Sequence, residues 1–298
     1  MTVTKGMVLV PAGSVVMGST DFYLEERPLR PADVPDLWFD EHPVTNAQFR
    51  RFVRDTGHVT VAERTPAAED FPDADPDQLV PGSQVFTGTE GPVSLDDWTR
   101  WWTWVPGANW RHPQGTGSTL DGLDRHPVVH VGFEDAIAYA EWAGKTLPTE
   151  EQWEHAARGG LHQASYPWGD DFTPRGKTMA NTWWGRFPWE NLATSQRKRT
   201  TPVKSYPPNG FGLFDVVGNV WEWTRSPWTA THVEPPATQV VSCCGPAGEL
   251  TEQDRRVIKG GSHLCAPSYC HRYRPAARQG HTVRSSTSHI GFRCCQPA

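Results

Sequence analysis

Two cysteines five positions apart, Cys265 and Cys270, are the residues of this sequence whose types and spacing most directly suggest chemistry. They lie in the stretch "KGGSHLCAPSYCHRYRPAAR", which places arginines at positions 272, 274 and 278 after them. Nearby cations favour the thiolate form of cysteine, which is both a nucleophile and a metal ligand. From the residues alone, three interpretations are open: a buried thiol pair or local disulfide, a metal-free redox pair, and a metal site.

A metal site at this pair would be soft and low in coordination number, because it offers two thiolates and little else. Such a site selects Cu(I) over zinc, which requires four ligands. The spacing differs from the CxxC of zinc sites and of thioredoxin-like proteins, and no His/Cys set completes a tetrahedron. The other cysteines form the adjacent pairs Cys243–Cys244 and Cys294–Cys295. We interpret these as structural or weakly metal-binding rather than catalytic.

The composition is that of a soluble globular protein, with 298 residues, 37% hydrophobic and 21% charged. A net charge of −6 argues against a general nucleic-acid binder, which would carry an excess of basic residues. The chain shows neither a signal peptide nor a segment as long as a membrane span. We therefore expect a cytoplasmic protein without membrane or nucleic-acid partners, in a compartment where thiols stay reduced.

Two helices carry clear boundary signals. Thr45 with Gln48 three residues later forms a capping box, Gly57 ends that helix, and Phe49, Phe52 and Val53 form its apolar face. Thr149 with Gln152 repeats the capping pattern for a second helix that ends at Gly159. Between them we expect a strand in "HPVVHV" and a helix from Phe133 to Ala143, stopped by Gly144.

The remaining pattern indicates many turns and short strands. Gly and Pro number 27 each, and the 15 tryptophans predict aromatic core filling, with a few lining a groove. "MVLVPAGSVVMGS" favours a hairpin, and residues 65–99, rich in Pro and Asp, predict a long surface loop. With no linker and no repeat, the sequence predicts a single α+β domain over residues 1–298.

In their order, several segments resemble the formylglycine-generating enzyme (sulfatase-modifying factor) family. They are "VPAGSVVMGS", "HPVTNAQF", "WVPGANWRHP", "HPVVHV", "LPTEEQWEHAARGGL", "YPWGD", "ANTWWGRFP", "PPNGFGLFDVVGNVWEWT", "KGGSHLC" and "HIGFRC". The resemblance covers nearly the whole chain and implies that family's variant of the C-type-lectin-like fold. Since fold membership alone does not give chemistry, the cysteine pair after "GGS" carries the functional implication.

The resemblance implies a copper- and O2-dependent oxidase of a protein cysteine. Cys265 and Cys270 would hold Cu(I), and the substrate would be an extended sulfatase segment with the motif Cys-x-Pro-x-Arg. Its cysteine would become Cα-formylglycine. Bound metal would carry the hard chemistry, and the protein would supply geometry and a dry pocket.

Further site residues follow from the same resemblance. Three residues match positions at the family's active site: Ser262 in "GGS", Trp221 in "GNVWEW" and Tyr269. The alternative for Ser262 is a hydroxyl in a turn, and the alternative for Trp221 is a core residue without a catalytic role. Ala266 stands where many family members have a histidine that is a candidate proton shuttle. The positions that resemble the wall of the peptide groove are Arg278, Ser286 and His289, with a solvated surface as the alternative.

The resemblance also implies structural calcium. One site would use the Asp215 carboxylate with the carbonyls of Val216, Gly218 and Val220, a hard-cation ligand set in a tight loop. A second would use Asn181 and the Thr182 carbonyl, but Ser195 replaces its acidic ligand, so we expect it to be weak or lost. His126, His130 and Glu134 mimic a metal triad; along a strand they would span too great a distance to chelate one ion.

Two other function classes stay open. One is a non-catalytic module of the same fold that binds peptides or proteins, which failure to bind Cu(I) would favour. The other is a metal-free thiol–disulfide oxidoreductase that uses Cys265 and Cys270.

Overall fold

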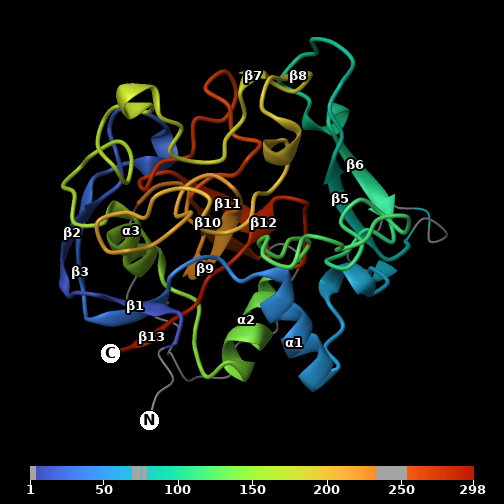
Figure 1. Ribbon diagram of the computed structural model, residues 1–298, viewed down its shortest axis with the longest axis horizontal. Helices are drawn as coiled ribbons and strands as arrows, with labels where there is room; N and C mark the ends of the chain where they lie inside the picture. Colours follow the sequence, from blue (N-terminus) through green and yellow to red (C-terminus); the bar gives the residue numbers. More distant parts are fainter. Residues whose placement is uncertain (1–4, 69–74, 76–78, 233–253) are drawn as a thin grey trace.

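The computed structural model describes residues 5–68, 75, 79–232 and 254–298 (Figure 1). Short strands and long connecting segments make up most of this part of the chain, with three α-helices among them. The α+β class expected from the sequence is therefore confirmed. Among the helices of the described residues, none combines the length and apolarity needed to cross a membrane.

A four-stranded sheet occupies the middle of the molecule, in the order β11, β10, β9, β12 (Figure 1). The first three are antiparallel neighbours, and the short β12 runs parallel to β9. Lys259, the last residue of β10, stands opposite Glu222 on one side and Arg278 on the other. Charged residues thus meet at the end of β10. The strands are β9 (Trp221–Pro227), β10 (Arg255–Lys259), β11 (Arg278–Thr282) and β12 (Ile290–Gly291).

The two N-terminal strands do not form the predicted hairpin. β1 pairs with β4, which also pairs with β13, whereas β2 pairs with β3. Pro11 cannot adopt the positive φ of a tight hairpin turn, and the Ala12 N–H donates to Asp36 Oδ1 at 2.7 Å. The connection is therefore held by other segments. The strands are β1 (Met7–Val10), β2 (Gly13–Met17), β3 (Arg30–Val34), β4 (Leu37–Asp40) and β13 (Cys295–Pro297).

The helices begin and end close to the predicted residues. α1 and α3 each have the expected capping box and end at a glycine in the left-handed conformation. α2 ends one residue earlier than predicted. Phe49, Phe52 and Val53 are buried, as the apolar pattern predicts. The bounds are α1 (Asn46–Thr56), α2 (Phe133–Trp142) and α3 (Glu150–Arg158).

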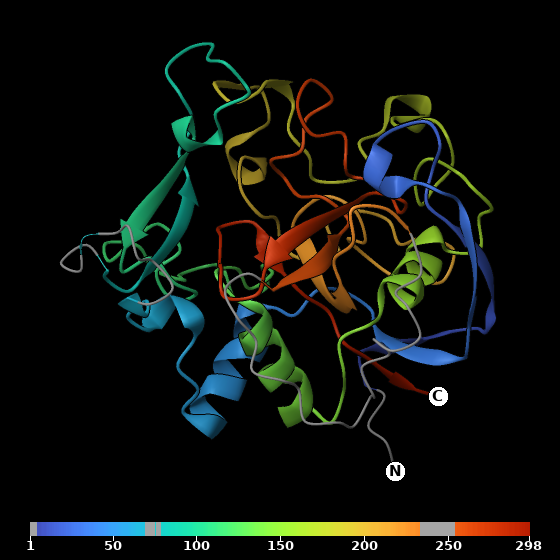
Figure 2. The same cartoon turned by 180° about the vertical axis from the view of Figure 1, so that it is seen from behind.

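The segment 65–99 is not a loop throughout. It contains β5 (Gly82–Phe86), which pairs with β6 (Trp102–Pro106), and this ribbon lies on the side of the central sheet opposite to β2 and β3 (Figures 1 and 2). The flanking prolines and aspartates concealed a strand of five residues. Part of the predicted loop, 69–74 and 76–78, lies outside the described residues. A further pair is β7 (Gly185–Arg186) with β8 (Glu190–Asn191).

The predicted strand "HPVVHV" is also wrong. His130 has a φ of 59°, and Pro127 makes an isolated bridge with Thr45. The Val128 N–H donates to the Val44 carbonyl, and the His130 N–H donates to the Thr287 carbonyl. Because successive backbone groups bond to different segments, the stretch is extended in parts but forms no continuous ladder.

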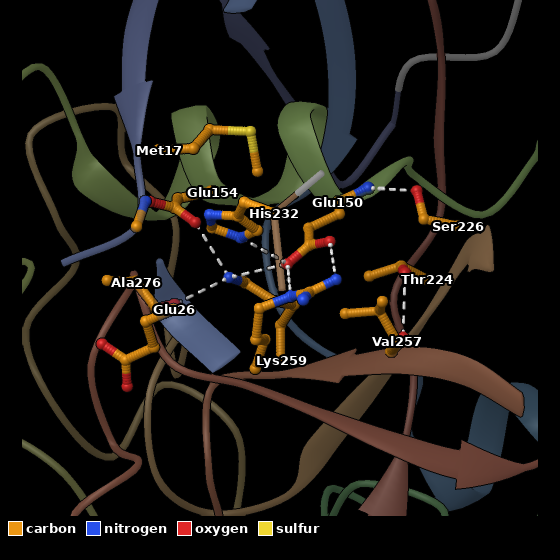
Figure 3. A network of polar contacts seen from close by, with 12 residues as sticks. Met17, Glu26, Glu150, Glu154, Thr224, Ser226, His232, Val257, Lys259 and Ala276 are labelled. Atoms are coloured by element: carbon orange, nitrogen blue, oxygen red, sulfur yellow. Dashed lines mark hydrogen bonds and ion pairs between the residues drawn. The ribbon is translucent and has the colours of Figure 1, made fainter. Parts of the chain in front are cut away.

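A buried network of ion pairs joins α3 to the central sheet (Figure 3). The Lys259 ammonium, which is fully buried, lies 2.9 Å from Glu154 and 3.5 Å from Glu150. Arg278 Nε lies 2.7 Å from Glu150, and Arg158 contacts Glu154 at 2.7 Å. Glu150 and Glu154 thus each meet cations from two directions, which offsets the cost of burying them.

The cations set the titration of Glu150. Burial alone would raise its pKa, but Lys259, His232 and Arg278 together outweigh burial and hold the pKa below the ordinary value of 4.5. A depressed carboxylate pKa stabilises the fold above the ordinary pKa and loses that contribution as pH falls through the depressed value. The network therefore contributes to stability at neutral pH and weakens in acid.

Replacing Lys259 with methionine should lower the free energy of unfolding by about 3–5 kcal/mol, because it leaves two buried carboxylates short of a cation. Urea unfolding followed by tryptophan fluorescence measures the change. Lys177→Met, at an exposed lysine, is the control and should stay within about 0.5 kcal/mol of the parent. Equal stability of the two variants would contradict the role of the network.

Candidate active site

Gly260 and Gly261 turn the chain from β10 toward the cysteines. Their φ values are 90° and 69°, and a Cβ at position 261 would lie 2.8 Å from the backbone of Arg272. The Cys265 N–H then donates to the Ser262 carbonyl at 3.0 Å, and the Cys270 N–H to the Ala266 carbonyl at 2.8 Å. These bonds fold the segment back on itself and bring the cysteine side chains together.

The Sγ atoms of Cys265 and Cys270 lie 3.2 Å apart, a distance that fits a thiol hydrogen bond. A disulfide is much shorter, at about 2.05 Å, so the pair is reduced. Both residues are buried, and the Ser262 N–H donates to Cys265 Sγ at 3.3 Å. The hydrogen bond from Cys265, helped by the charge of Arg272, lowers the pKa of Cys270 to about 7, whereas burial raises the pKa of Cys265.

The cysteine pair lines a cavity of about 540 Å³. This volume lies within the usual range of small-ligand sites. Six aromatic side chains line the wall together with polar and charged ones, so the two sulfurs face a cavity of mixed character. The aromatic residues are Trp101, Trp102, Phe187, Trp221, Trp228 and Tyr269.

Three residues predicted for the site do line this cavity. The Tyr269 ring stacks on Phe187 with centroids 4.6 Å apart, which fixes its orientation beside Cys270. His289 packs edge-on against Trp102 at 4.7 Å, and Trp221 forms part of the wall although it is almost fully buried. The structure thus brings together Trp221, Tyr269 and His289 from three separate parts of the sequence.

Arg278, which was expected on the groove wall, is not among the residues that line this cavity. Its side chain is buried in the ion-pair network with Glu150, and its Nη1 donates to the Thr229 carbonyl at 2.8 Å. Its guanidinium lies 4.6 Å from the ring centroid of Trp228, which does line the cavity. Arg278 therefore supports the wall from behind.

Ser286 and Ser262 are also buried and also lie outside the lining of this cavity. The Ser286 hydroxyl bonds to Ser83 at 2.8 Å, and it borders a different hollow of about 620 Å³ beside Trp104. The Ser262 hydroxyl accepts from the Leu264 N–H at 3.2 Å. In this structure Ser262 acts on the pair through its backbone N–H.

The charged wall residues Glu25, Arg255 and Arg272 were not predicted as site residues, and Glu25 and Arg272 form a pair beside Cys270. Arg272 Nη1 lies 3.8 Å from Cys270 Sγ, and its Nη2 binds Glu25 at 2.6 Å. The sequence shows that Arg272 follows Cys270 closely, but it does not show in which direction the Arg272 side chain extends. For Glu25, some 245 residues away, the sequence carried no signal.

Comparison with known proteins decides the family. The family model described as "Sulfatase-modifying factor enzyme 1-like domain" matches residues 1–298. A curated protein of Mycobacterium tuberculosis named "Formylglycine-generating enzyme" is 52% identical over 292 residues, which cover 97% of this chain and 96% of that protein. The chain belongs to the sulfatase-modifying factor family.

Relatives in the sulfatase-modifying factor family are not all catalysts. A Bos taurus protein named "Inactive C-alpha-formylglycine-generating enzyme 2" is 39% identical over 300 residues, which cover 99% of this chain and 89% of that one. Among solved structures, PvdO from Pseudomonas aeruginosa is 22% identical, with a TM-score of 0.62 over 98% of this chain and 94% of its own. That likeness confirms the fold and says nothing further about activity.

The loop expected from the family resemblance to hold the first calcium ion bends sharply. Asp215 and Gly218 have positive φ values of 52° and 73°, which wind residues 215–220 tightly. Burial raises the pKa of Asp215 to about 6, against a hydrogen bond from the Lys204 N–H. A cation beside this carboxylate would offset its burial. The expected carbonyl donors in the loop are those of Val216, Gly218 and Val220.

The second calcium position keeps one suitable oxygen. Asn181 Oδ1 is buried and, in the described part of the chain, has no hydrogen-bond partner. An unpaired buried acceptor suits a cation. Thr182 is buried next to it, but Ser195, in place of an acidic ligand, is exposed.

Other titratable clusters have partners of their own. His130 bonds to Ser83 Oγ at 2.7 Å, His126 to Thr200 Oγ1 at 3.0 Å, and Glu134 to Arg64, so the three residues are directed to separate places. Glu150, Glu154 and His232 lie close enough to hold a metal, but Lys259 occupies the space between the carboxylates (Figure 3).

Cys294, Cys295 and Ala266 are not among the described residues that line the cavity. Cys294 and Cys295 are free and fully buried, and burial raises the pKa of both. Cys243 and Cys244 lie outside the described residues. The Ala266 methyl is buried among Trp101, Trp183, Phe187 and Leu264, so position 266 supplies no proton-transfer group.

In the metal-free protein, Cys270 should react with iodoacetamide with a pH midpoint near 7 and ahead of Cys265, because the thiolate is the nucleophile. Peptide mass spectrometry after short labelling at each pH gives the two profiles. Cys265→Ala removes the hydrogen bond and should move the Cys270 midpoint upward. A midpoint for Cys270 that is the same with and without Cys265 would contradict the coupling.

Proposed function

We propose that this chain is a formylglycine-generating enzyme, which oxidises a cysteine in a Cys-x-Pro-x-Arg segment of a sulfatase to Cα-formylglycine. The observation that carries the proposal is the reduced pair Cys265 and Cys270, with 3.2 Å between the sulfurs, on the wall of an aromatic cavity. The names of its relatives support the same reaction. Because an inactive relative has the same fold, the site rather than family membership has to carry the argument.

The donor set fits copper(I). Across the described residues, no group of three or more His, Cys, Asp or Glu ligands includes either cysteine, so the site offers two soft sulfurs and no tetrahedral set. Two thiolates suit Cu(I), whereas a zinc site would need further ligands. Cys265 and Cys270 would hold the ion, and the Ser262 N–H would hydrogen-bond the sulfur of Cys265.

Bound copper would supply the electron transfer to O2 that protein side chains cannot provide. The chain itself would orient the substrate, and a bound peptide would displace water from the cavity. Trp221, Tyr269 and the other aromatic residues surround the sulfurs with apolar surface, which strengthens electrostatic interactions within the site. Oxidation of the cysteine carbon uses only part of the oxidising capacity of O2, so an external reductant completes the reaction.

The cavity suits an extended peptide with its cysteine directed inward. Its volume of about 540 Å³ accepts a few residues rather than a folded domain. Of the three predicted groove residues, His289 is the one that faces this cavity. An unfolded or newly synthesised sulfatase segment is therefore the proposed partner, and the cytoplasm, which keeps thiols reduced, is the proposed compartment.

Calcium is the second proposed ion, with a structural role at Asp215 and the carbonyls of Val216, Gly218 and Val220. The tight loop and the buried carboxylate support it. The position at Asn181 and Thr182 is proposed as the weaker of the two, since Ser195 brings no charge.

The protein loaded with one equivalent of Cu(I) should convert a Cys-Thr-Pro-Ser-Arg peptide to the aldehyde in the presence of O2 and a reductant. Mass spectrometry of the peptide follows the loss of sulfur. Cys265→Ser and Cys270→Ser should each lower the rate at least about 100-fold, because each removes one of two soft ligands. Cys294→Ser, at a buried cysteine away from the cavity, is the matched control and should keep the activity of the parent when folded.

Other outcomes would identify the alternative functions. Turnover of glutathione disulfide without copper would make the chain a thiol–disulfide oxidoreductase, which the short sulfur separation and the lowered pKa of Cys270 favour. Neither copper binding nor turnover would leave a peptide-binding module.

Calcium should raise the melting temperature of the parent by several degrees at millimolar concentration, since a ligand bound only by the folded state stabilises it. Asp215→Ala should abolish most of this calcium-dependent increase, and Asn181→Ala should retain most of it. Differential scanning fluorimetry with calcium or with a chelator measures both. An unchanged response in Asp215→Ala would place the ion elsewhere.

A further inference from the structure

Arg272 is the charged residue that stands nearest to the cysteine pair. Its Nη1 lies 3.8 Å from Cys270 Sγ, and its side chain lines the same cavity. Within the described part of the chain, no other cation has a recorded contact with either sulfur. Arg274 and Arg278, its neighbours in sequence, are buried against Glu26 and Glu150.

The N-terminal part of the chain holds this guanidinium in one orientation. Its Nη2 binds Glu25 Oε1 at 2.6 Å, and its central carbon lies 3.8 Å from the ring centroid of Tyr23. The Tyr23 hydroxyl in turn accepts from the His271 N–H at 2.9 Å. The Glu25 carboxylate and the Tyr23 ring, which is itself held by the His271 N–H, therefore orient the guanidinium. Its Nη2 is directed to Glu25 and its Nη1 to Cys270.

The Arg272 guanidinium would compensate negative charge at the proposed copper site. Two thiolates around one Cu(I) ion carry a net negative charge, and a substrate thiolate would increase it. A buried net charge is costly unless an opposite charge lies close to it. Glu25 does not cancel the cation fully, because its side chain is partly exposed to solvent and contacts Nη2 rather than Nη1.

Resting on the proposed function, we propose that Arg272 is a positioning residue that stabilises the two-thiolate copper centre by charge, with Tyr23 and Glu25 as its support. Its role is to hold a fixed positive charge beside Cys270. The segment at residues 23–25 thereby becomes part of the active site, although it lies far from the cysteines in sequence.

The test measures Cu(I) affinity, independently of turnover. The whole protein competes anaerobically with a chromogenic Cu(I) chelator at a fixed pH, for the parent and for three variants. Arg272→Gln should weaken binding at least about tenfold, equivalent to about 1.4 kcal/mol. Arg272→Lys keeps the charge and should recover most of the affinity.

Arg255→Gln is the matched control. Arg255 is a second arginine on the wall of the cavity, but its Nη2 bonds to the Gly280 carbonyl at 2.6 Å rather than to a cysteine. Its loss should change Cu(I) affinity by less than about twofold. Thermal unfolding of each variant shows whether it is folded. If Arg272→Gln does not fold, the Cu(I) affinity of Arg272→Lys is compared with that of the parent instead.

The outcomes separate the two proposals. Parent-like affinity in both Arg272 variants, with stoichiometric copper in the parent, would overturn the role of Arg272 and leave the copper enzyme intact. An equal loss of Cu(I) affinity in Arg272→Gln and Arg272→Lys would overturn the charge argument, because the shape of the guanidinium would then matter rather than its charge. A parent that binds no Cu(I) would overturn the copper site and this inference with it.

Discussion

The buried contact of Lys259 with Glu150 and Glu154 of α3 is the constraint on which the rest of the structure depends. Lys259 ends β10, and the chain continues from it through Gly260 and Gly261 to the cysteine segment. The same network includes Arg278, which backs Trp228 on the cavity wall. Because charges of both signs are fully buried, small displacements are costly, and the strand end from which the cysteines depart is held in place.

The site is assembled from distant segments with few regular elements. Tyr23 and Glu25 come from the N-terminal region, Trp101 and Trp102 from the edge of β6, and Trp221 from β9. Aromatic stacking and buried ion pairs take the place of long helices and wide sheets in fixing these segments. This explains why a chain rich in Gly, Pro and Trp can build a defined cavity.

Family membership and chemistry rest on different observations. Identity over nearly the whole chain establishes the sulfatase-modifying factor family, yet the family includes a relative named inactive. The proposed activity rests on local features of this chain: two sulfurs 3.2 Å apart, an arginine beside one of them, and a cavity lined by aromatic and polar side chains.

The sequence by itself determined the features that depend on neighbouring residues. Thr45 and Thr149 predicted helix starts because a capping box closes within one turn. The spacing of Cys265 and Cys270 left a thiol pair, a redox pair and a metal site open, and the family resemblance of the surrounding segment favoured the metal site. Only the tertiary structure decided the partners of β1 and β2, the strand hidden in 65–99, the burial of Arg278 and the direction of Arg272. Each of these depends on contacts between segments far apart in the chain. Which conformation has the lowest free energy is decided there by the acid or strand that the fold brings near, and not by the neighbouring residues in sequence.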